Sequence, residues 1–334
     1  MNNIKKERSL IGEVFKWYGI ILLVHCLETR VIRKYRLYKA SKYENYQIVN
    51  PSQIAELRNN VETIEYPDFT KKEIVKPYLE KLQEYVNEED LKIAYKNIAT
   101  LKIRKVPPTP LLVGGTYTPK KNKISYSKKK YFGHEFLHMA SCVYNKAKKI
   151  TLSGFCQRTK NADIGIGLNE GYTELLNRRL FTELNVKNPT SYQTLVEVTE
   201  IIEMFFDDKK DMAHLYFTNN LPRLIEHLSK YMPKEKAIDI IVELDKILIA
   251  YESTFGITDL KKAYKLKIRL LSLFKNSHPN ELEKIELMKE KISNDLYLQF
   301  QVLSQELKDA LKESIAERKA KVKQKIKSNE HNLS

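Results

Sequence analysis

The sequence predicts an α+β fold that is predominantly helical, with a small sheet beside a pair of helices and helical regions at both ends. Apolar residues recur at helical spacing through most of the 334 residues. Strand-like alternation of apolar and polar residues is confined to residues 101–127. Hydrophobic residues make up 42% and charged residues 30% of the chain, which is typical of a folded protein and excludes global disorder.

Five segments are expected along the chain. They are a basic N-terminal helical segment (1–48), a helical region leading into the sheet (49–106), a core segment (107–187), a C-terminal helical region (188–278) and a long helix with a basic tail (279–334). The three cysteines are widely spaced and form no CxxC pair, which argues against a disulfide framework and favours a cytoplasmic location.

The N-terminal segment contains an uninterrupted apolar run from Trp17 to Leu27. This run is shorter than the roughly 18 residues that a membrane span requires. We expect a helix that packs on the protein core, with a membrane-surface helix and a true anchor as the alternatives.

The expected elements follow in order. Residues 52–100 read as helices, Leu101–Val106 as a strand, and Leu111–Tyr117 with Lys123–Ser127 as two strands joined by a basic turn. Helical patterns return at about residues 129–148 and from Asn169, the expected N-cap, to about Leu184. The glycine-containing segment Ser153–Gly167 between them is expected to be a loop able to cover a cleft.

The sequence His-Glu-Phe-Leu-His at residues 134–138 carries the clearest chemical signal. On a helix, His134 and His138 lie on one face, so both imidazoles can bind one ion while Glu135 reaches a water held by that ion. Two neutral imidazoles and a carboxylate leave one position of Zn2+ open for water. We therefore expect one zinc ion per chain, with Glu135 as the general base.

A second helix is expected to complete this site. Glu170 and Glu174 are again four residues apart, so one can supply the third ligand while the other hydrogen-bonds the distal nitrogen of a ligand histidine. Gly171 between them allows a close backbone approach to the metal-binding helix.

These motifs resemble those of the gluzincins, thermolysin-like zinc metallopeptidases with HExxH on one helix and a glutamate ligand on a following helix. The resemblance covers roughly residues 111–184. It implies a minimal gluzincin core in which Glu170 is the third ligand. It also implies that Glu174, which stands where the family usually has an aspartate, supports the first histidine.

The resemblance further implies an edge strand immediately before the metal-binding helix, alongside which an extended peptide substrate binds. The residues of that strand are Lys123, Ile124, Ser125, Tyr126 and Ser127. Tyr172 and His214 are candidate donors to a transition-state oxyanion, with packed or surface side chains as the alternative for both.

The formal net charge is +16, which compositional bias and solubility can account for without an anionic partner, but basic residues also surround the expected cleft, where Lys128, Lys129 and Lys130 precede the metal-binding helix. This charge favours an acidic peptide substrate, unless it is only a solvated lysine-rich face.

The leading interpretation is a zinc metallopeptidase that acts on extended, acidic peptide segments. The alternative is a non-catalytic zinc-binding protein that docks on nucleic acid or an anionic lipid surface through its basic segments.

Overall fold

The computed structural model describes residue 35 and residues 48–59, 73–107, 114–160, 162–184, 192–254 and 260–294. The described residues fall into two compact units that divide after Ser277. The expected N-terminal apolar helix and the lysine-rich C-terminal tail lie outside the described residues. No helix within the described ranges combines the length and the apolar character that crossing a bilayer would require.

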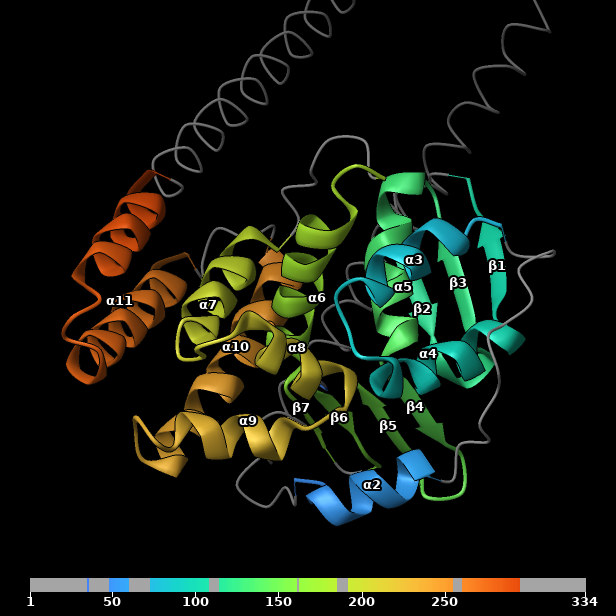
Figure 1. Ribbon diagram of the computed structural model, residues 1–334, viewed down its shortest axis with the longest axis horizontal. Coiled ribbons are helices and arrows are strands. Elements are labelled where there is room, and N and C mark those ends of the chain that lie inside the picture. Colours follow the sequence, from blue (N-terminus) through green and yellow to red (C-terminus); the bar gives the residue numbers. More distant parts are fainter. Residues whose placement is uncertain are drawn as a thin grey trace, which may run out of the picture. The chain divides into compact units, whose positions relative to one another are not determined.

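The first unit is mainly helical, as predicted, and Figure 1 shows its helices beside two small sheets. Its helices are α2 (Pro51–Asn59), α3 (Lys76–Gln83), α4 (Glu88–Thr100), α5 (Phe132–Ala140), α6 (Ile166–Phe181), α7 (Gln193–Glu203), α8 (Lys209–Phe217), α9 (Leu221–Leu228), α10 (Lys234–Thr254) and α11 (Leu260–Ser277). Its strands are β1 (Lys102–Lys105), β2 (Gly115–Thr118), β3 (Lys123–Tyr126), β4 (Cys142–Asn145), β5 (Ile150–Ser153), β6 (Cys156–Arg158) and β7 (Asp163–Ile164). Two 3-10 turns, η2 (Pro119–Lys121) and η3 (Lys129–Tyr131), precede β3 and α5.

Strand β3 is the centre of the three-stranded sheet, whose order is β1-β3-β2. It runs parallel to β1 and antiparallel to β2, so that Ile124 lies between Ile103 and Tyr117. The expectation that Lys123–Ser127 forms an edge strand is therefore wrong, because the backbone of β3 is paired on both sides. Among the described strands, β2 lies at the edge of this sheet on the side nearer α5.

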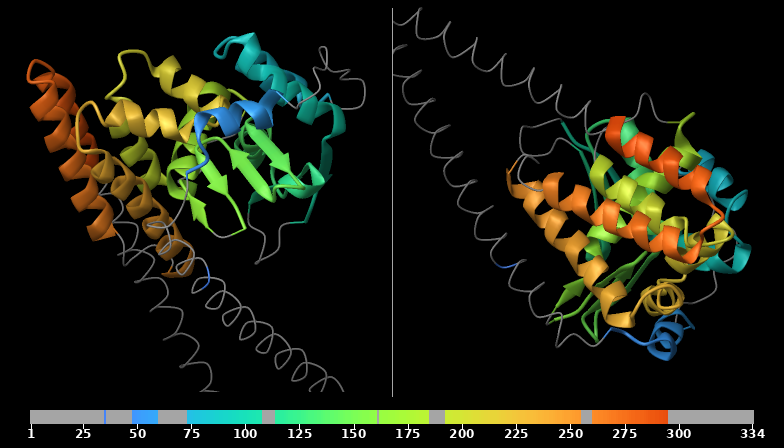
Figure 2. Two further views of the ribbon diagram at one scale, coloured as in Figure 1. Left: turned by 90° about the horizontal axis from the view of Figure 1, so that it is seen from below. Right: turned by 90° about the vertical axis from the view of Figure 1, so that its left-hand side faces the viewer.

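A second sheet, β4-β5-β6-β7, replaces two expected features. The helix expected to reach residue 148 ends at Ala140, and the chain turns into β4 at Cys142. The segment expected to be a loop, Ser153–Gly167, contains β6 and β7, both paired antiparallel in this sheet. Figure 2 shows α2 lying against the sheet, where Leu57 packs in one cluster with residues of β4 and β5.

Helix α5 runs through the interior of the first unit, and all nine of its residues are buried, including His134, Glu135 and His138. Buried polar side chains of this kind require partners inside the protein. Phe132 and Phe136 of α5 pack with Tyr78 of α3 and Phe181 of α6, with ring centroids 4.9 to 6.4 Å apart. This aromatic cluster fixes α5 against its two neighbouring helices, which sets the position of the polar residues between them.

Helix α6 lies between α5, α7 and α10. A Cβ atom on Gly171 would come within 2.4 Å of Thr199 Oγ1 and 2.7 Å of Leu195 O, so this glycine allows the close approach of α7. The expectation that Gly171 allows a close approach to the metal-binding helix is therefore wrong. The N-terminus of α6 is held by Asp245 of α10, which accepts hydrogen bonds from backbone N–H groups at its first turn.

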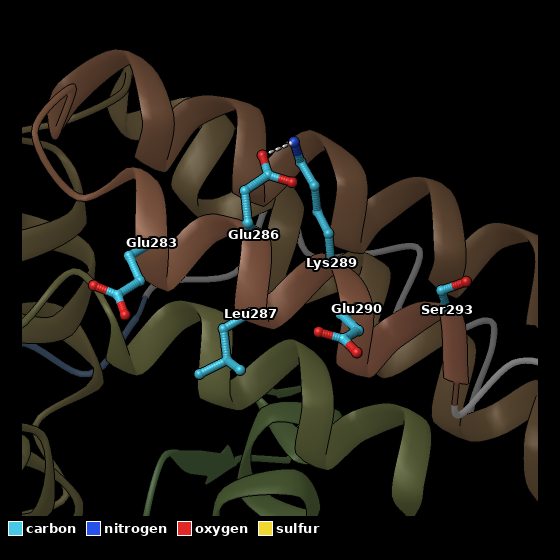
Figure 3. Close-up of a pocket in the computed structure, with 6 residues that line it drawn as sticks. All are labelled: Glu283, Glu286, Leu287, Lys289, Glu290 and Ser293. Carbon is cyan, nitrogen blue, oxygen red and sulfur yellow. Dashed lines mark hydrogen bonds and ion pairs between the residues drawn. The ribbon is translucent and has the colours of Figure 1, made fainter.

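The second unit is described from His278 to residue 294 and contains a helix over residues 282–294. Figure 3 shows the six side chains that line a shallow hollow along this helix, among which Glu286 and Lys289 form an ion pair of 2.6 Å. The lining side chains are Glu283, Glu286, Leu287, Lys289, Glu290 and Ser293, all of them exposed. Because all six lining side chains are exposed, the hollow is a solvated helix face. Exposed ion pairs of this kind contribute little to stability.

Candidate metal centre

Helix α5 presents both histidines of the candidate site on one face. The rings of His134 and His138 are 4.7 Å apart between centroids and nearly perpendicular, and both side chains are buried. Their Nε2 atoms approach each other to 3.0 Å. The four-residue spacing thus brings two imidazole nitrogens to a single point, as the sequence predicted.

Helix α6 adds the third member of the group. Glu170 Oε2 lies 3.1 Å from His134 Nε2 and 3.4 Å from His138 Nε2. Donor atoms about 2.0–2.1 Å from a tetrahedral ion are about 3.3 Å from one another. The three atoms therefore have the spacing that a single bound metal ion requires, and within the described residues they are the one such group of histidine, cysteine and carboxylate side chains.

Two further residues of α6 fix the orientation of the rings. Glu174 Oε2 lies 3.1 Å from His134 Nδ1, the ring nitrogen that points away from the metal position. Asn169 Nδ2 lies 3.3 Å from His138 Nδ1, while its Oδ1 accepts the Phe155 N–H at 3.1 Å. Partners of this kind restrict ring rotation and, when the partner is a carboxylate, increase the basicity of the opposite nitrogen.

The role found for Asn169 corrects an expectation. The N-cap of α6 is Gly165, four residues before the expected N-cap Asn169, and its φ of +78° suits a residue without a side chain. Asn169 therefore lies inside the helix and not at its start, where its buried amide faces the metal site.

The electrostatics of the group favour a bound cation. Burial acts to raise the pKa of Glu170, but the two histidines outweigh burial and hold that pKa well below its ordinary value. Burial lowers the pKa of His134, but hydrogen bonds to Glu170 and Glu174 outweigh it and raise that pKa to about 10. The surrounding carboxylates thus stabilise positive charge at this point, which a metal ion supplies.

Glu135 lies beside the group and is buried, with 7% of its surface exposed. The backbone N–H of Tyr117 on β2 acts to lower the pKa of its carboxylate. A Cβ atom on Gly115, also on β2, would stand 2.6 Å from Glu135 Cγ, so the glycine leaves room for this side chain. Burial raises the pKa of Glu135, whereas the two nearby histidines lower it.

A network of side-chain hydrogen bonds extends from Glu174 away from the metal ligands. Arg178 donates to Glu174 at 3.0 Å and to Gln193 of α7 at 2.6 Å. Gln193 donates to Glu197 at 2.8 Å, and Glu197 pairs with the buried Lys267 of α11. The carboxylate behind His134 is thus held by a network that spans α6, α7 and α11, which no local sequence motif indicates.

One aromatic residue near the site was also missed. The ring of Tyr192 stacks on His134 with centroids 5.7 Å apart and an angle of 21°. Tyr192 is the N-cap that precedes α7 and has a φ of +61°, which is an uncommon backbone conformation for tyrosine. Nothing in the residues around Tyr192 distinguishes it in sequence from other tyrosines.

The structure places the two candidate oxyanion donors elsewhere. Tyr172 is fully buried, and its ring packs against Phe155 and Tyr216. Its hydroxyl has no hydrogen-bond partner within the described part of the chain. His214 of α8 is half-exposed, and its Nδ1 lies 2.6 Å from Asp90 Oδ2 on α4. Neither residue is among the contacts found around His134 and His138.

Comparisons of the chain with protein-family models, with curated proteins and with solved structures found no match. The arrangement provides three donor atoms for one metal ion, a buried carboxylate next to them and an edge strand alongside.

Proposed function

We propose that the protein is a zinc-dependent peptidase. The observation that carries this proposal is the convergence of His134 Nε2, His138 Nε2 and Glu170 Oε2 to within 3.0–3.4 Å, with Glu135 buried on the same helix. Two imidazoles and one carboxylate with a free fourth position are the ligand set of catalytic zinc. A zinc ion bound there would lower the pKa of a water molecule to about 7 and polarise a substrate carbonyl.

Glu135 is the residue that favours catalysis over a structural role for the metal. A structural site requires only ligands, whereas Glu135 is a buried carboxylate that is not part of the ligand group. Its side chain lies against β2, where a Cβ atom on Gly115 would come within 2.6 Å of Glu135 Cγ. Because burial raises its pKa, the carboxylate binds a proton more readily than an exposed glutamate, as a general base must when it takes a proton from the attacking water and passes it to the leaving amine.

The substrate strand is proposed to be β2, in place of the β3 segment expected from sequence. Ser127 N–H donates to Gly114 O at 3.0 Å, which fixes the alternation of the antiparallel ladder between β2 and β3. By that alternation, the backbone groups of Gly115 and Tyr117 point away from β3, towards Glu135. An extended peptide could pair with the remaining groups on this edge and bring a carbonyl to the metal.

We further propose a preference for acidic segments near the cleaved bond and a cytoplasmic location. Lys128, Lys129 and Lys130 immediately precede α5, and no carboxylate within the described residues forms an ion pair with them. Changing all three to glutamate should weaken substrate binding and leave zinc content intact. If a peptide library shows no preference for acidic residues near the cleaved bond, and cleavage is the same at low and high salt, these lysines contribute only to solubility.

The test of the proposed activity is the substitution Glu135→Gln, which keeps the side-chain shape but removes the proton acceptor. Purified wild type and variant should each contain one zinc per chain and unfold at similar denaturant concentrations. Turnover of an unfolded protein substrate should fall by a factor of about 10² or more in the variant. Equal turnover in both proteins would remove Glu135 from the mechanism. A zinc-loaded wild type without hydrolysis would favour the non-catalytic alternative.

A further inference from the structure

A second candidate binding site lies in the first unit, away from the metal ligands. It is a cavity of about 440 Å3 lined by residues of α2, α4, β1, β2, η2 and β4. The lining residues are Leu57, Ile93, Lys96, Asn97, Thr100, Lys102, Tyr117, Pro119, Lys120, Lys121, Asn122, Cys142, Val143, Tyr144 and Asn145. Four of these residues are lysines and none is acidic, which gives the cavity a positive charge.

The four lysines have no ionic partner in the part of the chain that the structure describes. The ion pairs found there involve other lysines, such as Lys148, which pairs with Glu56 at 2.8 Å. Four unpaired cations around one cavity repel one another, and a bound anion would offset this repulsion. Phosphate oxygens suit this environment because several ammonium groups can donate to them at once.

The floor of the cavity is held by hydrogen bonds. The Tyr117 hydroxyl donates to Asn122 Oδ1 at 3.0 Å, and Asn122 Nδ2 donates to Thr100 Oγ1 at 2.8 Å. Asn97 Nδ2 donates to the backbone carbonyls of Met139 and Cys142 at 2.8 and 2.7 Å. These hydrogen-bonded side chains are therefore preorganised, so a ligand would bind without first ordering them.

Tyr144 gives the cavity a second recognition element. It lies on β4 and is 37% exposed, whereas the large aromatic residues of the core are almost completely buried. An exposed aromatic ring beside unpaired lysines and asparagine amides can stack against the base of a nucleotide while the lysines bind its phosphates. A cavity of about 440 Å3 suits a single nucleotide better than a continuous strand, which requires a longer groove.

We infer that this cavity binds a nucleoside phosphate, with Lys96, Lys102, Lys120 and Lys121 on the phosphates and Tyr144 on the base. This inference does not depend on peptidase activity. Binding can be measured whether or not the protein hydrolyses peptides.

The test is calorimetric titration of the zinc-loaded full chain with adenosine diphosphate, inorganic pyrophosphate and adenosine. The diphosphate should bind more tightly than either part alone, and its affinity should fall as salt rises. Replacing Lys96, Lys120 and Lys121 with glutamine should lower affinity at least about tenfold, because three phosphate contacts are removed. The matched control replaces Lys128, Lys129 and Lys130 with glutamine, which removes the same charge elsewhere and should leave affinity unchanged.

Tyr144→Ala separates the two halves of the site. It should lower diphosphate affinity about fivefold or more and leave pyrophosphate affinity unchanged, because only the stacking contact is lost. Denaturant unfolding should show that each variant remains folded. Absence of binding at millimolar diphosphate, or equal losses in the cavity and control triple variants, would overturn the inference. So would tight binding of a single-stranded oligonucleotide without binding of the mononucleotide.

Discussion

Glu174 offers a sharp test of how the metal site is built. Its carboxylate lies behind His134, with Oε2 3.1 Å from Nδ1, and only 2% of its side chain is exposed. The substitution Glu174→Gln keeps the shape of the side chain and removes its charge. A charged partner makes the opposite imidazole nitrogen a better donor to a metal, so the variant should bind zinc more weakly.

The expected size of the effect follows from residues of this kind in other metal sites. Removing such a partner costs about 10- to 100-fold in metal affinity, which is about 1.4 to 2.8 kcal/mol. The metal-free protein should also lose stability, by about 1–3 kcal/mol, because Arg178 donates to Glu174 at 3.0 Å and would lose a charged acceptor. Competition with a chromophoric chelator measures the first quantity, and denaturant unfolding of the metal-free protein measures the second.

Glu203 provides the matched control. It is also a buried glutamate paired with an arginine of α6, since Arg179 donates to it at 2.7 and 2.9 Å. It belongs to α7, and its pairing partner faces away from the metal ligands. Glu203→Gln should lower stability as Glu174→Gln does and leave zinc affinity unchanged. Equal zinc affinities in wild type and Glu174→Gln would refute the reasoning, as would equal losses of zinc affinity in the two variants.

Three further predictions concern residues around the site. Burial raises the pKa of Asp245 to about 7, although N–H groups at the start of α6 oppose it. The folded state therefore binds more protons than the unfolded chain, and stability should fall as pH rises from about 4 to about 7. This dependence of stability on pH should be absent in Asp245→Asn, as measured by denaturant unfolding at several pH values. The same pH dependence in wild type and variant would contradict the raised pKa of Asp245. Gly115→Ala should displace Glu135, because the added Cβ would stand 2.6 Å from Glu135 Cγ. Turnover should fall about tenfold or more with zinc content unchanged. Full activity would show that the small size of Gly115 is not needed for the position of Glu135. Phe136→Ala should lower the free energy of unfolding by about 3–5 kcal/mol, measured in denaturant, because it opens a cavity in the aromatic cluster. A loss below about 1 kcal/mol would mean that the cluster closes around the vacated space.

The part of the site that sequence predicted depends on local spacing. His134 and His138 share a helix face because four residues separate them, and any regular helix at that position would give the same result. Glu170 and Glu174 share a face of α6 for the same reason, with one on each side of His134. Helical spacing also predicted the helices α2, α3 and α4 before the first strand.

The part that sequence missed depends on contacts between distant residues. The start of α6 was placed at Asn169 because asparagine is a good N-cap, but Asp245, 78 to 80 residues away, accepts the N–H groups of Gly165 and Gly167 and stabilises an earlier start. No pattern near Asn169 carries that information.

Strand order in the three-stranded sheet was missed for a related reason. The alternation in Lys123–Ser127 correctly predicts a strand, but it does not determine which strands lie beside it. β1 comes from more than twenty residues earlier in the chain and pairs with β3 in parallel, so β3 becomes the centre and β2 the edge. Similarly, Cys142–Asn145 continues an apolar run that suits a helix, and only its pairing with β5 makes it a strand.

Zinc-edge X-ray absorption spectroscopy of the purified full chain tests the central claim most directly. Together with metal analysis, it should find one zinc per chain bound by nitrogen and oxygen atoms at about 2.0–2.1 Å, including two imidazoles. The imidazole signal should weaken or disappear in His138→Ala. Sulfur at about 2.3 Å, which would indicate ligation by cysteine, would contradict the assignment to His134, His138 and Glu170. An unchanged spectrum in His138→Ala, or a wild-type protein that binds no zinc, would contradict it equally.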